Sequence, residues 1–229
     1  MKVWVHSFID FFFPRYCVLC SDILSRGQEC LCVKCDMDMP RTNFHRIPNN
    51  SMEKMLWGRV PIEKATSYFY YSKGGNYNKL VHQLKYKGNK ELGKAMGACM
   101  ANEIKDSGFF NTVDFIVPVP LHPRKQRKRG YNQSEWIAQG IAQITGIPCE
   151  TNLLTRTKYT DTQTRKSAHN RMESMDEVFK SAALLQCEGK HILLVDDILT
   201  TGSTIVACSD ALNESQNIRI SVLTLGVAT

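Results

Sequence analysis

Two adjacent carboxylates followed by small hydroxyl residues form the part of the sequence best suited to chemistry. Residues 192–204 read Ile-Leu-Leu-Val-Asp-Asp-Ile-Leu-Thr-Thr-Gly-Ser-Thr. Hydroxyl groups can donate hydrogen bonds to an anion, and a glycine lets the backbone approach it closely. A helix that starts after the glycine would add free amide groups and a positive dipole end. The residues expected to hold a phosphate monoester are Thr200, Thr201, Gly202, Ser203 and Thr204.

The carboxylates of Asp196 and Asp197 cannot serve a phosphate directly, because like charges repel. They can bind sugar hydroxyls, or a Mg²⁺ ion that itself binds a diphosphate. A phosphate beside a ribose and a metal-bound diphosphate describes phosphoribosyl pyrophosphate (PRPP). An acidic turn that caps an ordinary helix is the simpler alternative, but the ordered combination of strand, acidic pair and hydroxyl loop favours PRPP.

A basic stretch follows an apolar segment that ends in Val117-Pro-Val-Pro-Leu-His-Pro-Arg124. Five of the six residues at 124–129 are Lys or Arg. As a loop beside the acidic pair, this stretch could clamp the pyrophosphate and stabilise its departure, with Arg124 and Arg129 as candidates. A solvated surface run is the alternative. A second group could belong to a mobile loop over the site or to a plain surface loop: Arg156, Gln163, Thr164, Lys166 and Arg171.

Nine cysteines are present, and five of them fall within residues 17–35. Two Cys-x-x-Cys pairs can each hold one side of a metal ion, and four thiolates complete a tetrahedral Zn²⁺ site. Four thiolates leave no open coordination position, so we expect structural zinc. Redox chemistry or an iron–sulfur cluster is the alternative, and Cys30 could replace Cys32 as a ligand. The expected ligands are Cys17, Cys20, Cys32 and Cys35.

The elements that must position these residues follow from the spacing of apolar side chains. Helical stripes occur at Tyr77–Leu84, after Asn132, and at Ile205–Leu212. Asn132 and Glu135 suit a capping box, and Gly146 suits a helix end. Buried strands are expected at residues 113–119, 192–195 and 218–227. Alternating strands and helices imply a mostly parallel sheet flanked by helices, with ligand sites at the carboxyl ends of strands.

The bulk properties describe an ordinary globular chain of 229 residues with a net charge of +7. Residues 3–13 are aromatic but interrupted by polar groups, so we interpret them as a short amphipathic segment packed on the protein. They resemble neither a secretory signal nor a membrane span, and a cytoplasmic protein is expected. We divide the chain into an N-terminal segment with the cysteine module, 1–45, and an α/β domain, 46–229. Residues 46–65 are interpreted as a connector.

Residues 195–204 resemble the PRPP-binding motif of type I phosphoribosyltransferases. The resemblance implies that fold, with the hydroxyl loop on the 5-phosphate and Asp196 and Asp197 on the ribose hydroxyls. The cysteines, Pro-Val-Pro-Leu-His-Pro-Arg, Arg129-Gly-Tyr-Asn-Gln133 and the acidic motif, in that order, resemble the ComF family (competence protein F) and the related GntX proteins. At the position where that family tends to have Asn, this chain has Ser174.

The resemblance leaves two kinds of function open. The first is an enzyme that binds PRPP and Mg²⁺ and transfers the phosphoribosyl group with release of pyrophosphate. The second is a non-catalytic DNA-uptake accessory protein that binds single-stranded DNA or a helicase partner in natural transformation. A regulator that senses PRPP without turnover would share the site of the first.

Overall fold

The computed structural model describes residues 14–156, 179–181, 187–213 and 217–229. The segments at residues 3–13 and the loop candidates Gln163, Thr164, Lys166 and Arg171, with Ser174, lie outside the described residues. In chain order the elements are α2 (Val33–Met37), η1 (Phe44–Arg46), α3 (Ser51–Leu56), β1 (Ile62–Tyr71), α4 (Asn78–Tyr86), α5 (Lys90–Ile104), η2 (Lys105–Ser107), β2 (Phe115–Pro118), α6 (Pro123–Arg129), α7 (Gln133–Thr145), β3 (Leu154–Arg156), β4 (Phe179–Ser181), β5 (His191–Leu199), α9 (Ser203–Leu212) and β6 (Arg219–Ala228).

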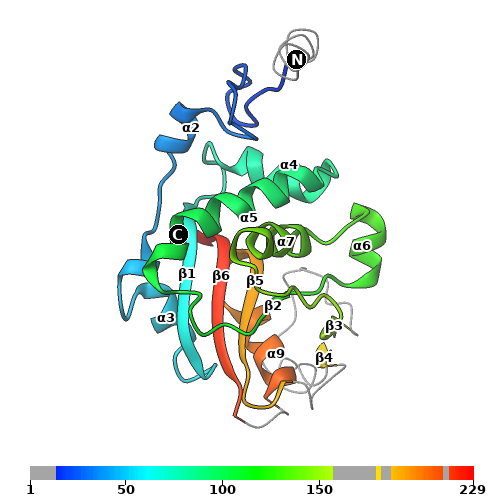
Figure 1. Ribbon diagram of the computed structural model, residues 1–229. Helices are drawn as coiled ribbons and strands as arrows, with labels where there is room; N and C mark the ends of the chain where they lie inside the picture. The colour runs from blue at the N-terminus through cyan, green and yellow to red at the C-terminus, as the bar shows by residue number, and fades with distance from the viewer. Residues whose placement is uncertain (1–13, 157–178, 182–186, 214–216) are drawn as a thin grey trace.

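The main sheet has four strands in the order β1-β6-β5-β2, and every neighbouring pair is parallel. The predicted parallel sheet is therefore confirmed (Figure 1). Its edge strand β1 was not predicted, because it begins inside the segment interpreted as a connector. That segment also holds α3, so the interpretation as a connector was wrong. The strand expected at residues 192–195 is longer than predicted and includes the acidic pair.

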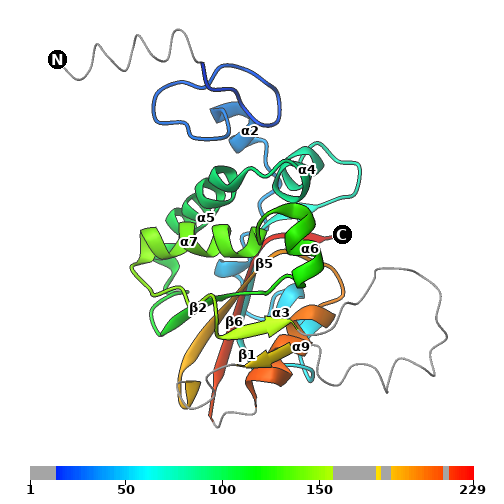
Figure 2. The same cartoon turned by 90° about the vertical axis from the view of Figure 1, so that its right-hand side faces the viewer.

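Alternate side chains of β5 enter two separate cores, one on each face of the sheet. Leu193 and Val195 pack with residues of α4, α5 and α7. Ile192 and Leu194 pack with residues of α3 and α9. Figures 1 and 2 show these helices on opposite sides of the sheet. A parallel sheet covered on both faces needs nearly continuous apolar strands, and the burial of residues 191–195 in β5 follows that rule.

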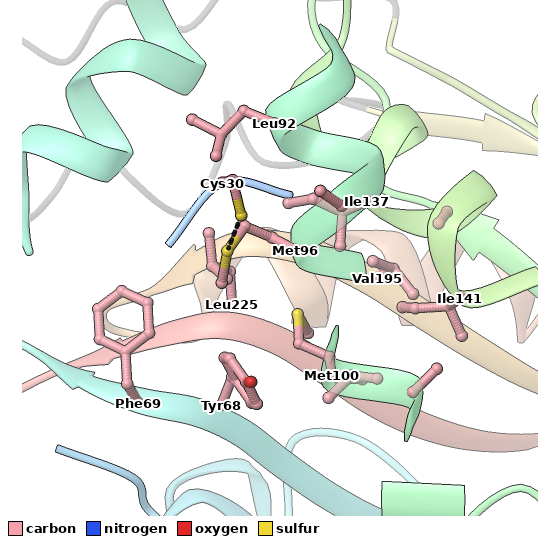
Figure 3. Packing of buried hydrophobic residues seen from close by; sticks show 14 of the residues in the cluster. Cys30, Tyr68, Phe69, Leu92, Met96, Met100, Ile137, Ile141, Val195 and Leu225 are labelled. Carbon is pink, nitrogen blue, oxygen red and sulfur yellow. Dashed lines mark hydrogen bonds between the residues drawn. The ribbon is translucent and has the colours of Figure 1, made fainter. Parts of the chain in front are cut away.

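The cysteine module packs on the same core as the sheet. Cys30 and Leu31 are buried in the cluster that contains Met96 and Met100 of α5. The sulfur atoms of Cys30 and Met96 lie 3.6 Å apart. Figure 3 marks this contact with a dashed line. Arg41 links the two parts again, because its Nε donates to Glu103 Oε2 of α5 at 2.9 Å. The division at residue 45 stays a prediction.

Two local predictions differ from the structure. The basic stretch forms helix α6 rather than a loop, since Pro123 occupies its first turn and the His122 side chain caps it. Asn132 caps α7 as predicted, accepting a hydrogen bond from the Ser134 amide at 3.3 Å. Glu135 does not complete a capping box in the described bonds; it accepts from Gln139 instead. No helix in the described part of the chain is both long and apolar enough to cross a membrane.

Candidate functional site

The acidic pair lies in the carboxyl half of β5, an inner strand flanked by β6 and β2. Asp196 and Asp197 were expected just after the strand, but β5 continues to Leu199. Both side chains are partly buried. The strand therefore fixes the backbone of both carboxylates, and the loop that follows begins three residues later.

Asp196 is held by two hydrogen bonds. Its Oδ1 accepts from Ser134 Oγ at 2.9 Å and from the Asp197 amide at 2.8 Å. Burial, followed by the neighbouring charge of Asp197, raises the pKa of Asp196 to about 7. These two causes outweigh the hydrogen bonds and the nearby Lys85 ammonium, which act in the opposite direction. Near neutral pH the carboxyl group is therefore divided between its charged and neutral forms.

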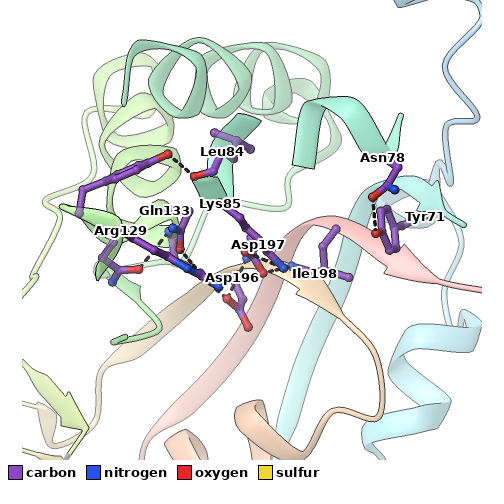
Figure 4. Close-up of polar contacts among 12 residues, drawn as sticks. Tyr71, Asn78, Leu84, Lys85, Arg129, Gln133, Asp196, Asp197 and Ile198 are labelled. Atoms are coloured by element: carbon purple, nitrogen blue, oxygen red, sulfur yellow. Dashed lines mark hydrogen bonds and ion pairs between the residues drawn. The ribbon is translucent and has the colours of Figure 1, made fainter. Parts of the chain in front are cut away.

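Asp197 has its own partners. Its Oδ1 accepts from the Ile198 amide at 2.6 Å, and its Oδ2 lies 3.2 Å from Lys85 Nζ (Figure 4). Lys85 was not predicted as a site residue. Its helix was predicted, but nothing in the spacing of α4 indicates which carboxylate the lysine reaches.

The hydroxyl loop joins β5 to α9 at the same edge of the sheet. Gly202 caps α9 with φ of 74°, and a Cβ there would lie 2.9 Å from Leu56 Cδ2. Among the described residues no side-chain hydrogen bond caps this helix, so its first amide groups could bind an anion. Thr200, Thr201 and Ser203 are exposed, and Thr204 is half-buried. The structure thus places all five predicted residues together.

Arg59 is a further residue that the sequence did not indicate. Its Nη1 donates to the Thr201 carbonyl at 2.9 Å. This contact holds a guanidinium group beside the hydroxyl loop, where it adds positive charge to the helix end.

Arg124 and Arg129, the two basic candidates, lie at opposite ends of α6. Arg129 is held between α7 and α4: its Nη1 donates to Gln133 Oε1 at 2.9 Å, and its guanidinium lies 5.7 Å from the centre of the Tyr86 ring. Arg124 is exposed at the first turn, where its amide donates to His122 Nδ1 at 3.1 Å. Burial, with the nearby Arg156 and Arg124, lowers the pKa of His122. The structure therefore gives this histidine a capping role.

The four predicted metal ligands converge. The sulfur atoms of Cys17, Cys20, Cys32 and Cys35 all lie within 4.8 Å of one another. Sulfurs on a tetrahedral zinc ion at about 2.3 Å are separated by roughly 3.8 Å, so the cluster fits such an ion after small adjustments. Burial would raise the pKa of Cys17, but amide groups of Cys20, Cys32 and Leu19 hold it at about 6.

Cys30 does not belong to this cluster. It is buried against Met96, and burial raises the pKa of its thiol to about 12. The suggestion that Cys30 could replace Cys32 was therefore wrong. Cysteine spacing could not decide this, because both residues lie close enough along the chain to reach the first pair.

Comparison with known proteins gives the class of this chain. A family model described as a phosphoribosyl transferase domain matches residues 82–225. This match spans more than half of the chain, which therefore belongs to the phosphoribosyl transferase domain family. Within that class, the relatives confirm the resemblance to the competence protein F group.

Relatives from Salmonella typhimurium and Escherichia coli K12 are both named DNA utilization protein YhgH. The one from Salmonella typhimurium is 34% identical over 136 residues, which cover 58% of this chain and 59% of that protein. The one from Escherichia coli K12 is 28% identical over 199 residues, covering 86% and 83%. Competence protein F of Haemophilus influenzae is 36% identical over 100 residues, covering 43% and 44%.

Solved structures give a weaker likeness. A Bacillus subtilis glutamine PRPP amidotransferase, complexed with ADP and GMP, is 20% identical and has a TM-score of 0.40. The match covers 62% of this chain and 30% of that one. A score this low adds nothing to the argument for function.

Proposed function

We propose that the protein binds PRPP at the carboxyl edge of β5 and transfers its phosphoribosyl group to an acceptor. One observation carries this proposal: the acidic pair leads directly into a hydroxyl loop that ends on the uncapped start of α9. The 5-phosphate would bind Thr200–Thr204 and the α9 amides. The ribose hydroxyls would bind Asp196 and Asp197, whose carboxyl groups suit neutral donors.

In the transfer step, a nucleophilic acceptor forms a bond to ribose C1 while the bond from C1 to the diphosphate oxygen breaks. That oxygen leaves with the electron pair as pyrophosphate. Arg129, and Arg124 at the far end of α6, would stabilise the charge that develops on it. Mg²⁺ would arrive bound to the diphosphate, where it neutralises part of the same charge.

The four-cysteine cluster would hold a structural zinc ion. Its four sulfur atoms lie within 4.8 Å of one another, close to the spacing that a tetrahedral zinc ion requires. With four sulfur ligands no position remains for a substrate, so we assign the ion no part in the transfer.

Calorimetric titration with PRPP, with and without Mg²⁺, tests the proposal. The matched control is the double variant Asp196→Asn with Asp197→Asn, which keeps the shape of the site and removes its charge. Binding that depends on Mg²⁺ and is lost in the double variant supports a working PRPP site. Pyrophosphate release with an added amine or nucleobase would then establish turnover. Absence of binding up to millimolar PRPP would refute the proposal.

A second candidate is binding of single-stranded DNA by α6. Three of its basic residues, Arg124, Arg127 and Lys128, are exposed, and the relatives are named for DNA utilization and competence. Phosphate contacts release counterions, so binding should weaken steeply as salt rises. Arg127→Gln with Lys128→Gln should reduce both the affinity and the salt slope, whereas Lys105→Gln, on η2, should not. A protein partner such as a helicase would be the next test if the strands fail to bind.

A further inference from the structure

Lys85 is placed where it controls the charge of the acidic pair. Its Nζ lies 3.2 Å from Asp197 Oδ2, and the two side chains are only 25% and 13% exposed. Figure 4 shows Lys85 directed from the last turn of α4 toward Asp197. A fully solvated ion pair contributes little, but one shielded to this extent interacts in a lower dielectric.

The end of α4 that carries Lys85 is fixed by residues 129–131, at and just after the end of α6. Tyr131 Oη donates to the Leu84 carbonyl, and the Arg129 guanidinium lies over the Tyr86 ring. The residues on either side of Lys85 are thus both held by this segment, which also leads into Ser134, the donor to Asp196. Lys85 is therefore presented to the acidic pair by packing.

The ion pair has a cost for the proposed ligand. A ribose hydroxyl that donates to Asp197 Oδ2 must compete with an ammonium group already there. Asp196 is a weaker charged acceptor near neutral pH, because burial and then the charge of Asp197 raise its pKa to about 7. A ligand that carries only a sugar and one phosphate has nothing to offer Lys85 in exchange. A diphosphate does, since it accepts strong charge-assisted hydrogen bonds from an ammonium group.

We propose that Lys85 is an internal counter-cation of Asp197 that moves to the diphosphate of the bound ligand, so that Asp197 becomes available to the ribose only when a diphosphate is present. This inference rests on the proposed PRPP function and deepens it. Lys85 then favours PRPP over ribose 5-phosphate, which shares the sugar and the 5-phosphate. Lys85 is thus a specificity-determining residue, and its two alternative partners are the Asp197 carboxylate and the diphosphate.

The test uses Lys85→Gln and two part-ligands, ribose 5-phosphate and inorganic pyrophosphate, titrated by calorimetry. The variant should bind ribose 5-phosphate more tightly than the wild type, because Asp197 is free. It should bind pyrophosphate more weakly, by roughly tenfold or more, because one charge-assisted contact is lost. A simple loss of structure would weaken both ligands and could not give these opposite changes.

Two further variants keep the result interpretable. Lys87→Gln removes the same charge from the exposed end of α4 and should leave both affinities unchanged. Lys85→Arg keeps the charge and should bind ribose 5-phosphate as weakly as the wild type. If wild-type protein binds PRPP but Lys85→Gln changes both affinities in the same direction, or neither, the role of Lys85 is overturned and the PRPP site stands. If wild-type protein does not bind PRPP, both proposals fall.

Discussion

At the scale of single residues, Asp196 and Asp197 differ although they are adjacent in the sequence. Asp197 has a lysine partner, whereas Asp196 relies on a serine hydroxyl and one amide. Burial raises the pKa of Asp196, and the neighbouring carboxylate of Asp197 raises it further because like charges repel. Tertiary contacts thus give two identical side chains different partners.

This difference predicts a pH dependence of stability. The pKa of Asp196 is about 7 in the folded protein, and an unfolded aspartate has a pKa of about 3.9. Between these values the unfolded state binds fewer protons, so the free energy of unfolding should fall as pH rises from about 4 to about 7. Asp196→Asn should lack this part of the fall. Urea unfolding of both proteins at pH 5, 6, 7 and 8 measures it.

The free energy of unfolding of Asp196→Asn, relative to that of the wild type, should increase up to about pH 7 and then level off. Each pKa unit is worth about 1.4 kcal/mol at most, since solvent screening reduces the effect. A difference that does not vary with pH would contradict the raised pKa.

At the scale of elements, two glycines set how closely α5 and α7 approach. A Cβ on Gly97 would lie 2.1 Å from the Ile137 carbonyl oxygen, and one on Gly140 would lie 2.1 Å from the Lys94 carbonyl oxygen. Both obstacles are backbone atoms and cannot move aside by changing rotamer. Because Ser134 belongs to α7, this contact also positions one side of the acidic pair.

Gly97→Ala should therefore destabilise the protein, although alanine favours a helix by about 1 kcal/mol over glycine. Overpacking costs about 1–3 kcal/mol, and here it acts on backbone, so we expect a net loss. Thermal unfolding measures it, with Asn102→Ala on the exposed face of α5 as the control. A stabilised Gly97→Ala protein would show that the helices can separate without cost.

At the scale of the whole molecule, the cysteine module and the sheet share one core. Cys17, Leu24 and Leu31 are buried in the same cluster as Met96 and Leu225. A metal ion bound by the cysteine module should therefore stabilise the main domain as well as the module, because loss of the ion exposes part of this shared cluster. Metal binding and unfolding of the main domain are then linked.

Metal removal tests this link. Cys32→Ala should lose the bound zinc and lower the midpoint of the single thermal transition by roughly 5–10 °C, an effect of several kcal/mol for a chain of this size. A chelator added to the wild type should act in the same way. Cys30→Ala should keep one zinc per chain, because this sulfur packs on Met96 outside the cluster. A main transition that is unchanged after zinc loss would show that the module is independent.

The sequence by itself determined the class of fold and the position of the hydroxyl loop. Those features depend on residues close together in the chain: the apolar run of β5, the acidic pair, and the hydroxyl residues around Gly202. Local spacing also predicted which four cysteines form the cluster that could hold a metal ion: Cys17, Cys20, Cys32 and Cys35. Strand β1 was missed because its start lies in a segment marked by prolines and asparagines, which local reasoning assigns to a connector.

Only the tertiary structure decided which distant residues meet the site. Lys85, Arg59 and Ser134 come from three different helices or loops. The hydrogen bond of Ser134 to Asp196 joins residues 62 positions apart, and that of Arg59 to Thr201 joins residues 142 positions apart. It also placed Cys30 in the core and the basic stretch on a helix. Such pairings depend on how the elements pack across the sheet. Many side chains contribute to the free energy of packing, so no short segment of the sequence determines it.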